Sequence, residues 1–208
     1  MKIVAVSQRI DDYPDRNERR DALDQKLSSF LTECGFFSLP VPNALSKKRE
    51  RQSGVASNEL ESWLKVFKPS AVLLSGGNEV GSCIDRDCTE KGLIDFASMR
   101  SLPVLGICRG MQMMATLAGS SLRKVTGHVR TRHVLQGGVI SGEVNSYHGM
   151  SVDSCPSGYK VLATSEDGEI EAIRHEEFPQ EGWMWHPERE KSFDTRDIQR
   201  VRNLFSDR

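Results

Sequence analysis

The sequence lacks the features that mark several large classes of protein. Its five cysteines are scattered over 208 residues without C-x-x-C spacing, which suits neither a disulfide framework nor a structural zinc site. Lysine and arginine number 28 against 29 aspartates and glutamates. The resulting net charge of -1 gives no bulk attraction to nucleic acid or to an anionic membrane. We therefore expect free thiols, no nucleic-acid partner and no membrane partner.

Long apolar runs and nucleotide-binding loops are also missing. The apolar run within residues 1–9 is too short for a signal peptide, and no later window is long enough for a membrane span. The chain contains no H-E-x-x-H zinc motif, no Walker loop and no G-x-G-x-x-G. These absences predict a cytoplasmic protein that uses no metal and no cofactor, and that cannot drive amide synthesis with ATP by itself.

The first half alternates short buried strands with amphipathic segments. Apolar runs at 3–6, 71–74 and 104–107 are typical of strands in a parallel sheet. Helical spacing of apolar residues predicts helices over 17–34, 58–67 and 89–99. These β-α-β units predict an α/β fold with right-handed crossovers.

The second half changes character. Alternating segments at 139–144, 159–165 and 169–174 predict antiparallel additions to the parallel sheet, and 195–205 predicts a closing helix. Residues 43–57 are polar and basic, which favours an exposed loop over a ligand-binding flap; the role of the basic stretch 47–51 stays open. The length favours one domain over residues 1–208.

Cys108 lies where a predicted strand gives way to an amphipathic helix, with Gly106 and Gly110 on either side. A nucleophile in such a tight turn is held at the carboxyl edge of the sheet. The partial positive charge of the helix N-terminus also favours the thiolate form. An unpaired cysteine is equally often a buried small hydrophobe, so Cys108 alone does not settle the function.

Two distant segments offer partners for this thiol. The strand at 71–74 runs into Gly76 and Gly77, whose backbone N–H groups can face a ligand and supply half of an oxyanion hole, with the N–H of Arg109 as the other half. An ordinary Gly-Gly turn is the alternative. Near the C-terminus, His186 can act as base and then as acid while Glu188 orients its ring.

Three motifs together carry a family likeness: G-I-C-R-G-M-Q at 106–112, V-N-S-Y-H at 144–148 and W-H-P-E at 185–188. They resemble the class I glutamine amidotransferases, in particular the γ-glutamyl hydrolase branch. The resemblance implies a flavodoxin-like, mostly parallel sheet flanked by helices, a Cys108–His186–Glu188 triad, and oxyanion N–H groups from Gly77 and Arg109. The implied substrate-binding residues are Gly76, Asn78, Gln112, Tyr147, His148, Gly149, Met150, Arg130 and Arg132.

Within that branch, the chain resembles the γ-glutamyl-CDP-amidate hydrolases in three features. These are its short length, the motif S-G-G-N-E at 75–79 and the motif G-H-V-R-T-R-H at 127–133. Those enzymes release glutamate and cytidine diphosphoramidate on the way to phosphoramidate decorations of bacterial surface polysaccharide. Arg109, Arg130 and Arg132 could pair with diphosphate oxygens through forked donors. A solvated basic loop is the competing interpretation.

Three hypotheses for the function follow. The first is a hydrolase of a small γ-glutamyl conjugate, with γ-glutamyl-CDP-amidate ahead of γ-glutamyl-GABA or a γ-glutamyl polyamine. The second is a glutaminase subunit that supplies ammonia to a separate synthase, and the third is a non-catalytic binding module. Met184 and Asn78-Glu79 depart from the family pattern, so the leaving amine stays open. Ammonia channelling and the oligomeric state, including a homodimer, stay open too.

Overall fold

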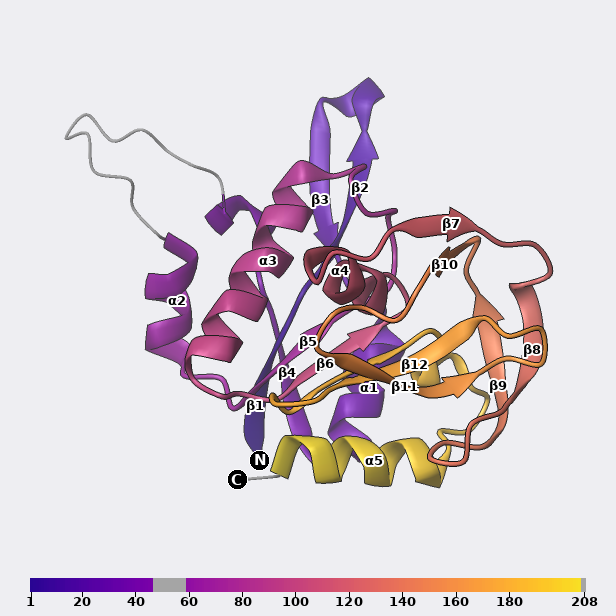
Figure 1. Cartoon of the computed structure of the whole chain (residues 1–208). Coiled ribbons are helices and arrows are strands. Elements are labelled where there is room, and N and C mark those ends of the chain that lie inside the picture. The colour runs from indigo at the N-terminus through magenta and orange to yellow at the C-terminus, as the bar shows by residue number, and fades with distance from the viewer. Residues whose placement is uncertain (47–58, 207–208) are drawn as a thin grey trace.

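The computed structural model describes residues 1–46 and 59–206, so the basic stretch 47–51 lies outside the described residues. A seven-stranded sheet in the order β11-β12-β13-β6-β5-β1-β4 forms the centre of the molecule (Figure 1). Its strands are β1 (Lys2–Val6), β4 (Phe36–Pro40), β5 (Ala71–Leu74), β6 (Val104–Ile107), β11 (Tyr159–Thr164), β12 (Ile170–His175) and β13 (Gln180–Trp183). The five strands from β13 to β4 are parallel, and β11 and β12 add antiparallel pairs. The predicted mostly parallel sheet with antiparallel additions is confirmed.

Helices cover both faces of this sheet because successive strand residues point to opposite sides. Val4 and Val6 of β1 pack in one apolar cluster with α1 (Gln25–Glu33) and α5 (Thr195–Ser206). Ala5, between them, belongs to the opposite cluster with α2 (Glu59–Phe67) and α3 (Ile84–Met99). The result is a three-layer α/β/α arrangement.

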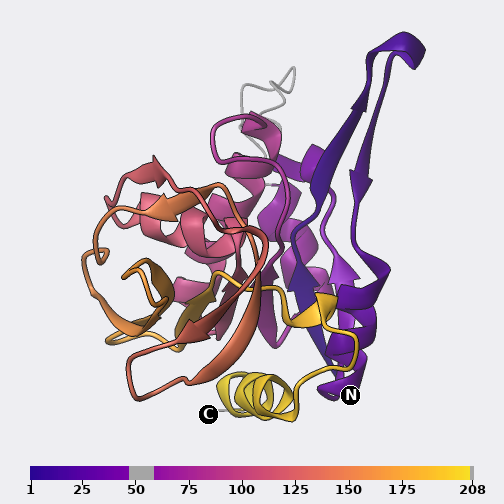
Figure 2. The ribbon, with the colours of Figure 1, turned by 90° about the vertical axis from the view of Figure 1, so that its right-hand side faces the viewer.

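The predicted helix over 17–34 is wrong in its first part. Helix α1 begins only at Gln25, where the carboxylate of Asp24 accepts a hydrogen bond from the backbone N–H of Lys26. The preceding residues form β3 (Glu18–Ala22), which pairs with β2 (Arg9–Tyr13) in a hairpin that projects from the body of the molecule (Figure 2). Opposite charges face each other across the hairpin, so its strands carry no hydrophobic alternation to predict them.

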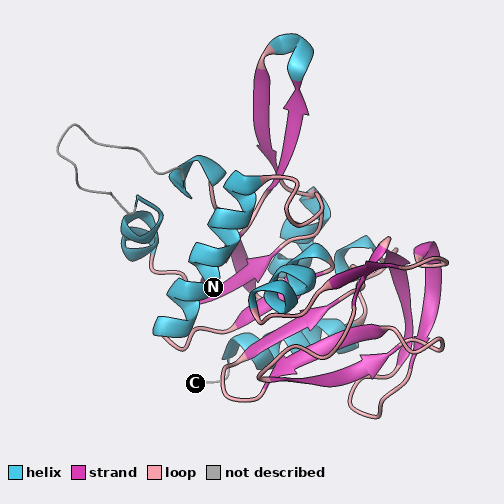
Figure 3. Ribbon diagram, turned by 45° about the horizontal axis from the view of Figure 1, so that its top comes forward, coloured by secondary structure: helices cyan, strands magenta, loops and turns pink. Residues whose placement is uncertain are grey.

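Other boundaries shift by a few residues. Helix α3 begins at Ile84 rather than Thr89, and η2 (Asn43–Ser46) is a short 3-10 helix at the start of the predicted loop. The strand predicted at 139–144 is β9 (Gly142–Tyr147), which pairs with β8 (Val129–Leu135). A second small ribbon joins β7 (Leu122–Lys124) to β10 (Met150–Val152), and both ribbons lie beside the antiparallel end of the sheet (Figure 3).

No helix within residues 1–46 and 59–206 is long and apolar enough to cross a membrane.

The carboxyl ends of the parallel strands bring distant residues to one edge of the sheet. Strand β5 leads into Ser75 and the two glycines, β6 leads into Cys108, and β13 leads into the segment before His186. Helix α4 (Arg109–Leu117) starts directly after Cys108 and passes so close to β5 that a Cβ on Gly110 would lie 2.2 Å from the carbonyl oxygen of Leu74. The sheet edge is therefore fixed by a backbone contact that only glycine permits.

We predict that Gly110→Ala lowers the free energy of unfolding by about 2 kcal/mol or more, because the added methyl must separate α4 from β5. Gly149→Ala is the matched control, since a Cβ there meets nothing within 4 Å and Gly149 has no positive φ. Denaturant unfolding of both variants checks this. Equal stabilities would show that the close approach of α4 to β5 does not constrain the fold.

Candidate active site

Cys108 occupies a strained turn between β6 and α4. Its backbone has φ 49° and ψ -104°, a region that non-glycine residues seldom adopt. The Cys108 N–H donates to the carbonyl of Trp183 on β13, 2.6 Å away. A Cβ on Gly106 would lie 2.7 Å from the backbone of Gly110, so both flanking glycines are needed, as predicted. The turn leaves Cys108 8% exposed at the sheet edge.

His186 and Glu188 come from the segment after β13, at the start of η3 (Pro187–Arg189). His186 Nδ1 lies 2.7 Å from Glu188 Oε1, and both residues are almost fully buried. With Nδ1 engaged by the carboxylate, Nε2 is the ring nitrogen left for the Cys108 thiol. Burial alone would lower the pKa of His186, but hydrogen bonds to Cys108 and Glu188 raise it to about 9. The arrangement therefore favours an imidazolium facing the sulfur.

Asn145 fixes the backbone of His186, a role that sequence reasoning did not identify. Its side-chain oxygen accepts from the His186 N–H at 2.9 Å, and its side-chain nitrogen donates to the His186 carbonyl at 2.8 Å. Both bonds are buried and link β9 to the segment after β13. Asn145 lies inside the V-N-S-Y-H motif, so a buried polar residue within a family motif is the signal that could have identified it.

The Gly76-Gly77 segment lies against the imidazole. A Cβ on Gly76 would lie 2.5 Å from His186 Cε1, and Gly77 has φ 124°, which a side chain would strain. Only glycines allow the backbone to approach the ring this closely. The two glycines thus bring the backbone that follows β5 next to His186, where the N–H of Gly77 stays a candidate for the oxyanion hole.

A buried network of ion pairs holds the backbone of the Gly76-Gly77 loop. Arg86 on α3 donates to the carbonyls of Ser75 and Gly76 at 2.6 and 3.0 Å, and pairs with Glu90 at 3.0 Å. Ser7 joins the network by donating to the Glu90 carboxylate at 2.8 Å while it accepts from the Ser75 N–H at 2.9 Å. The carbonyls of the loop are therefore directed toward Arg86, which limits how the loop can rotate.

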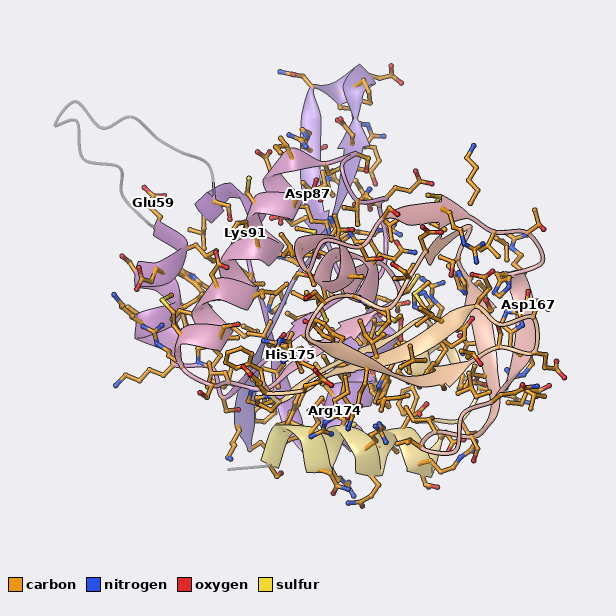
Figure 4. All side chains as sticks on the ribbon, viewed as in Figure 1. Glu59, Asp87, Lys91, Asp167, Arg174 and His175 are labelled. Carbon is orange, nitrogen blue, oxygen red and sulfur yellow. The ribbon has the colours of Figure 1, made fainter. Side chains whose placement is uncertain are left out.

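The guanidinium of Arg109 belongs to the same network. It donates to the carbonyl of Asn78 at 3.1 Å and pairs with Asp87 and Glu90; Figure 4 labels Asp87 on α3. The side chain is 1% exposed. The expectation that this guanidinium binds a diphosphate is wrong, because it is buried among carboxylates. Its backbone N–H, at the start of α4, stays a candidate for the oxyanion hole.

Of the next three substrate-binding candidates, Tyr147 borders the site, whereas Gln112 and Asn78 bond to backbone groups of the protein. Tyr147 lies edge-on to the His186 ring, with 5.8 Å between ring centroids, and is half-exposed beside the site. Gln112 donates to the carbonyl of Met150 at 2.9 Å, so its amide fixes the 147–150 segment. The side-chain oxygen of Asn78 accepts a hydrogen bond from the N–H of Ile10 in β2, and its side-chain nitrogen donates to the Ile10 carbonyl. These bonds indicate that Gln112 and Asn78 position the backbone.

His148 points into a separate buried cluster with His128 and Glu171. Gly149, next in the chain, has open space around its Cα. His128 is 1% exposed and lies in the interior. The imidazole of His148 has both ring nitrogens within 3.3 Å of polar atoms of this cluster or of Met150, which leaves it no free nitrogen to offer a substrate.

Arg130 and Arg132 lie on β8, where Arg130 is exposed with φ 56° and Arg132 pairs with Glu143 and Glu190.

A different pair of arginines borders the site. Arg9 and Arg189 line a pocket of about 220 Å³ together with Gly76, Gly77 and Glu188. Arg189 also stacks over the Tyr147 ring at 4.9 Å. Sequence reasoning missed both; Arg9 could have been identified from its place just after the carboxyl end of β1.

Similarity to known proteins agrees with this arrangement. A protein-family profile described as glutamine amidotransferase class-I matches residues 41–205. The γ-glutamyl-CDP-amidate hydrolase of Campylobacter jejuni is 33% identical over 145 residues, which cover 65% of this chain and 70% of that protein. One subunit of the glutamine-hydrolysing GMP synthase of Methanothrix thermoacetophila is 35% identical over 127 residues, covering 56% and 66%.

Two solved structures share the fold. A Thermoplasma acidophilum protein described as a candidate GMP synthase subunit superimposes with a TM-score of 0.72 at 20% identity, covering 99% of this chain and 93% of that one. A glutamine amidotransferase from Thermotoga maritima gives 0.61 at 18% identity, covering 99% and 83%. From the family profile, the similar proteins and the shared fold, we conclude that the chain belongs to the class I glutamine amidotransferase family.

Proposed function

We propose that this protein hydrolyses a γ-glutamyl amide through a thioester on Cys108. The observation that carries the proposal is the arrangement of three side chains: a cysteine in a strained turn, a buried imidazole whose pKa that cysteine raises, and a buried carboxylate 2.7 Å from Nδ1 of the imidazole. Nucleophile, acid–base group and orienting group are therefore in the order that covalent acyl transfer requires.

Each residue has a defined task in the reaction. The Cys108 thiolate attacks the γ-carbonyl carbon, and the N–H groups of Gly77 and Arg109 stabilise the oxyanion. Collapse of the tetrahedral intermediate breaks the C–N bond while His186 gives its proton to the leaving nitrogen. Neutral His186 then takes a proton from water, whose oxygen attacks the thioester carbon. Glutamate leaves and the thiolate–imidazolium pair is restored.

For the substrate, we propose γ-glutamyl-CDP-amidate, with cytidine diphosphoramidate as the released product. The similarity to the Campylobacter jejuni hydrolase supports this choice. The pocket beside Gly77 supports it further, because Arg9 and Arg189 line it together with the carboxylates of Asp24 and Glu188, and guanidinium groups bind phosphate oxygens through paired donors. Arg9 also pairs with Asp11 at 2.9 Å, an ion pair that a phosphate would have to displace. Arg130 and Arg132 on β8 stay the second candidate pair.

A glutaminase subunit is the alternative. The relatives described as GMP synthase subunits favour it, since they match the chain at 29–35% identity over 127–140 residues. In this case the substrate would be glutamine, and turnover would rise with a synthase partner. Hydrolysis of γ-glutamyl-GABA or a γ-glutamyl polyamine would use the same three side chains with a different amine in the pocket.

We predict that Cys108→Ala lowers glutamate release by about 10³-fold or more while the protein stays folded, because no other group can form the thioester. Cys88→Ala is the control, since Cys88 is exposed on α3, and its turnover should match the wild type. Glutamate release and circular dichroism provide the two readouts. A folded Cys108→Ala protein with wild-type turnover would refute the proposal.

The pH dependence tests Glu188. The active form holds a protonated His186, so activity should fall as the pH rises through about 9. Glu188→Gln removes the negative charge that stabilises the imidazolium. The alkaline limb of kcat/KM should therefore move to lower pH by about one unit. Glu190→Gln is the control, because Glu190 pairs with Arg132 and Asn145 and not with the ring. An unchanged limb in Glu188→Gln would exclude this role.

A substrate panel tests the leaving group. Glutamine, γ-glutamyl-GABA, a γ-glutamyl polyamine and γ-glutamyl-CDP-amidate should be compared by kcat/KM, with the last expected to be preferred by about 10²-fold or more. The Arg9→Ala/Arg189→Ala double variant should lose about 10-fold or more on γ-glutamyl-CDP-amidate and little on glutamine. The Arg130→Ala/Arg132→Ala variant is the comparison. A loss confined to that second variant would move the phosphate site to β8.

A further inference from the structure

Three histidines and a glutamate from three parts of the chain lie close together. They are His128 before β8, His133 within β8, His148 between β9 and β10, and Glu171 on β12. One ligand atom from each lies within 4.8 Å of all the others. His128, His148 and Glu171 are 0–3% exposed, and His133 is half-buried. This cluster is distinct from Cys108, His186 and Glu188.

The outer hydrogen bonds of two imidazoles determine which nitrogens carry protons. His148 Nδ1 lies 3.0 Å from the carbonyl oxygen of Met150, which can only accept. His128 Nε2 lies 2.9 Å from Asp167 Oδ2. The Asp167 side chain is 57% exposed, and an exposed aspartate is ionised near neutral pH, so this carboxylate also accepts. Both imidazoles therefore donate outward, and their unprotonated nitrogens point into the cluster.

The inward atoms are then acceptors facing acceptors. His128 Nδ1 lies 3.3 Å from His148 Nε2, and Glu171 Oε1 lies 3.3 Å from His148 Nε2 and 3.5 Å from His128 Nδ1. In addition, His133 Nε2 and Glu171 Oε2 are buried without a hydrogen-bond partner among the residues that the structure describes. Lone pairs so close together are stabilised only by a positive charge placed between them.

The distances among three of the four ligands have the size that a tetrahedral metal site requires. Zinc–nitrogen and zinc–oxygen bonds of about 2.0–2.1 Å in a tetrahedron separate neighbouring ligand atoms by about 3.3–3.4 Å. The separations among the ligand atoms of His128, His148 and Glu171 are 3.3, 3.3 and 3.5 Å, close to this value, and the ligand atom of His133 lies within 4.8 Å of each of them. Imidazole nitrogens with one carboxylate oxygen suit zinc among the common divalent ions. Metal-bound histidines also usually donate their other N–H to a carboxylate or carbonyl, as His128 and His148 do here.

We propose that His128, His133, His148 and Glu171 bind a structural zinc ion. Four protein ligands would leave no open coordination position, which is typical of structural rather than catalytic zinc. The ion would tie β8 and the 147–150 segment to β12 of the central sheet; Figure 4 shows Asp167, the outer partner of His128, at this end of the molecule. A zinc ion here departs from the expectation that the protein uses no metal. The sequence did not predict the site, because only His128 and His133 are close in sequence and the other two ligands come from distant segments.

A shared proton is the competing explanation, since one imidazolium would also satisfy the inward acceptors. Metal analysis separates the two explanations.

The Cys108→Ala protein is the starting material, because it cannot bind zinc through Cys108 and His186. Grown with zinc and purified without chelator or affinity tag, it should contain about one zinc per chain. Removing zinc should lower Tm by roughly 5 °C or more, and zinc should restore it. Zinc-free protein that does not respond to added zinc would overturn the proposal.

Variants test whether the metal is bound at this cluster. In the same background, Glu171→Gln and His133→Ala should each reduce bound zinc to about a tenth or less. The control His175→Ala should retain it, because His175 packs against Tyr159 and Phe178 away from the cluster. Zinc retained in all variants would be adventitious and would overturn the proposal.

Cobalt substitution covers the case in which the variants do not fold. Co²⁺ bound to the intact cluster should show the intense visible absorption of tetrahedral coordination. Only weak octahedral absorption would contradict the four-ligand site.

Discussion

The close contact between α4 and β5 is the constraint on which the rest of the site depends. Gly110 lies against the carbonyl of Leu74, so α4 must begin immediately beyond the end of β6. The chain can make this turn only if Cys108 adopts φ 49°. The strained conformation holds the thiol at the carboxyl edge of the sheet. His186 reaches the same point because β13 pairs with β6 and continues in parallel beyond it.

The buried ion network around α3 extends this constraint to the glycine loop. Burying Arg86, Glu90 and Arg109 costs desolvation, and pairs of this type are weak evidence for stability. Their geometry explains their presence better. The two guanidinium groups hold the loop by the carbonyls of Ser75, Gly76 and Asn78, and these bonds do not use the N–H of Gly77. We infer that the network acts by positioning the loop rather than by touching the substrate.

The sequence predicted the parallel core and the residues of the proposed triad, because buried strands are short apolar runs and the motifs follow strand ends. It missed the β2–β3 hairpin, because charged residues occupy most positions of the two strands and leave no apolar period. The predicted contact between the Arg109 guanidinium and a diphosphate was wrong, because the position next to Cys108 does not determine where the side chain points. The guanidinium lies among buried carboxylates instead. The roles of Asn145 and His148 depend on pairings between distant segments, which one sequence cannot show.

The central claim is that a γ-glutamyl group is carried on Cys108. Rapid acid quench of the wild-type enzyme with a saturating γ-glutamyl substrate, followed by mass mapping of peptides, tests this most directly. We predict a mass increase of one γ-glutamyl group on the peptide that contains Cys108, formed within the first turnover and lost on alkaline treatment, as a thioester should be. Turnover without any acylated cysteine, or acylation of Cys34, Cys83, Cys88 or Cys155 instead, would contradict the account.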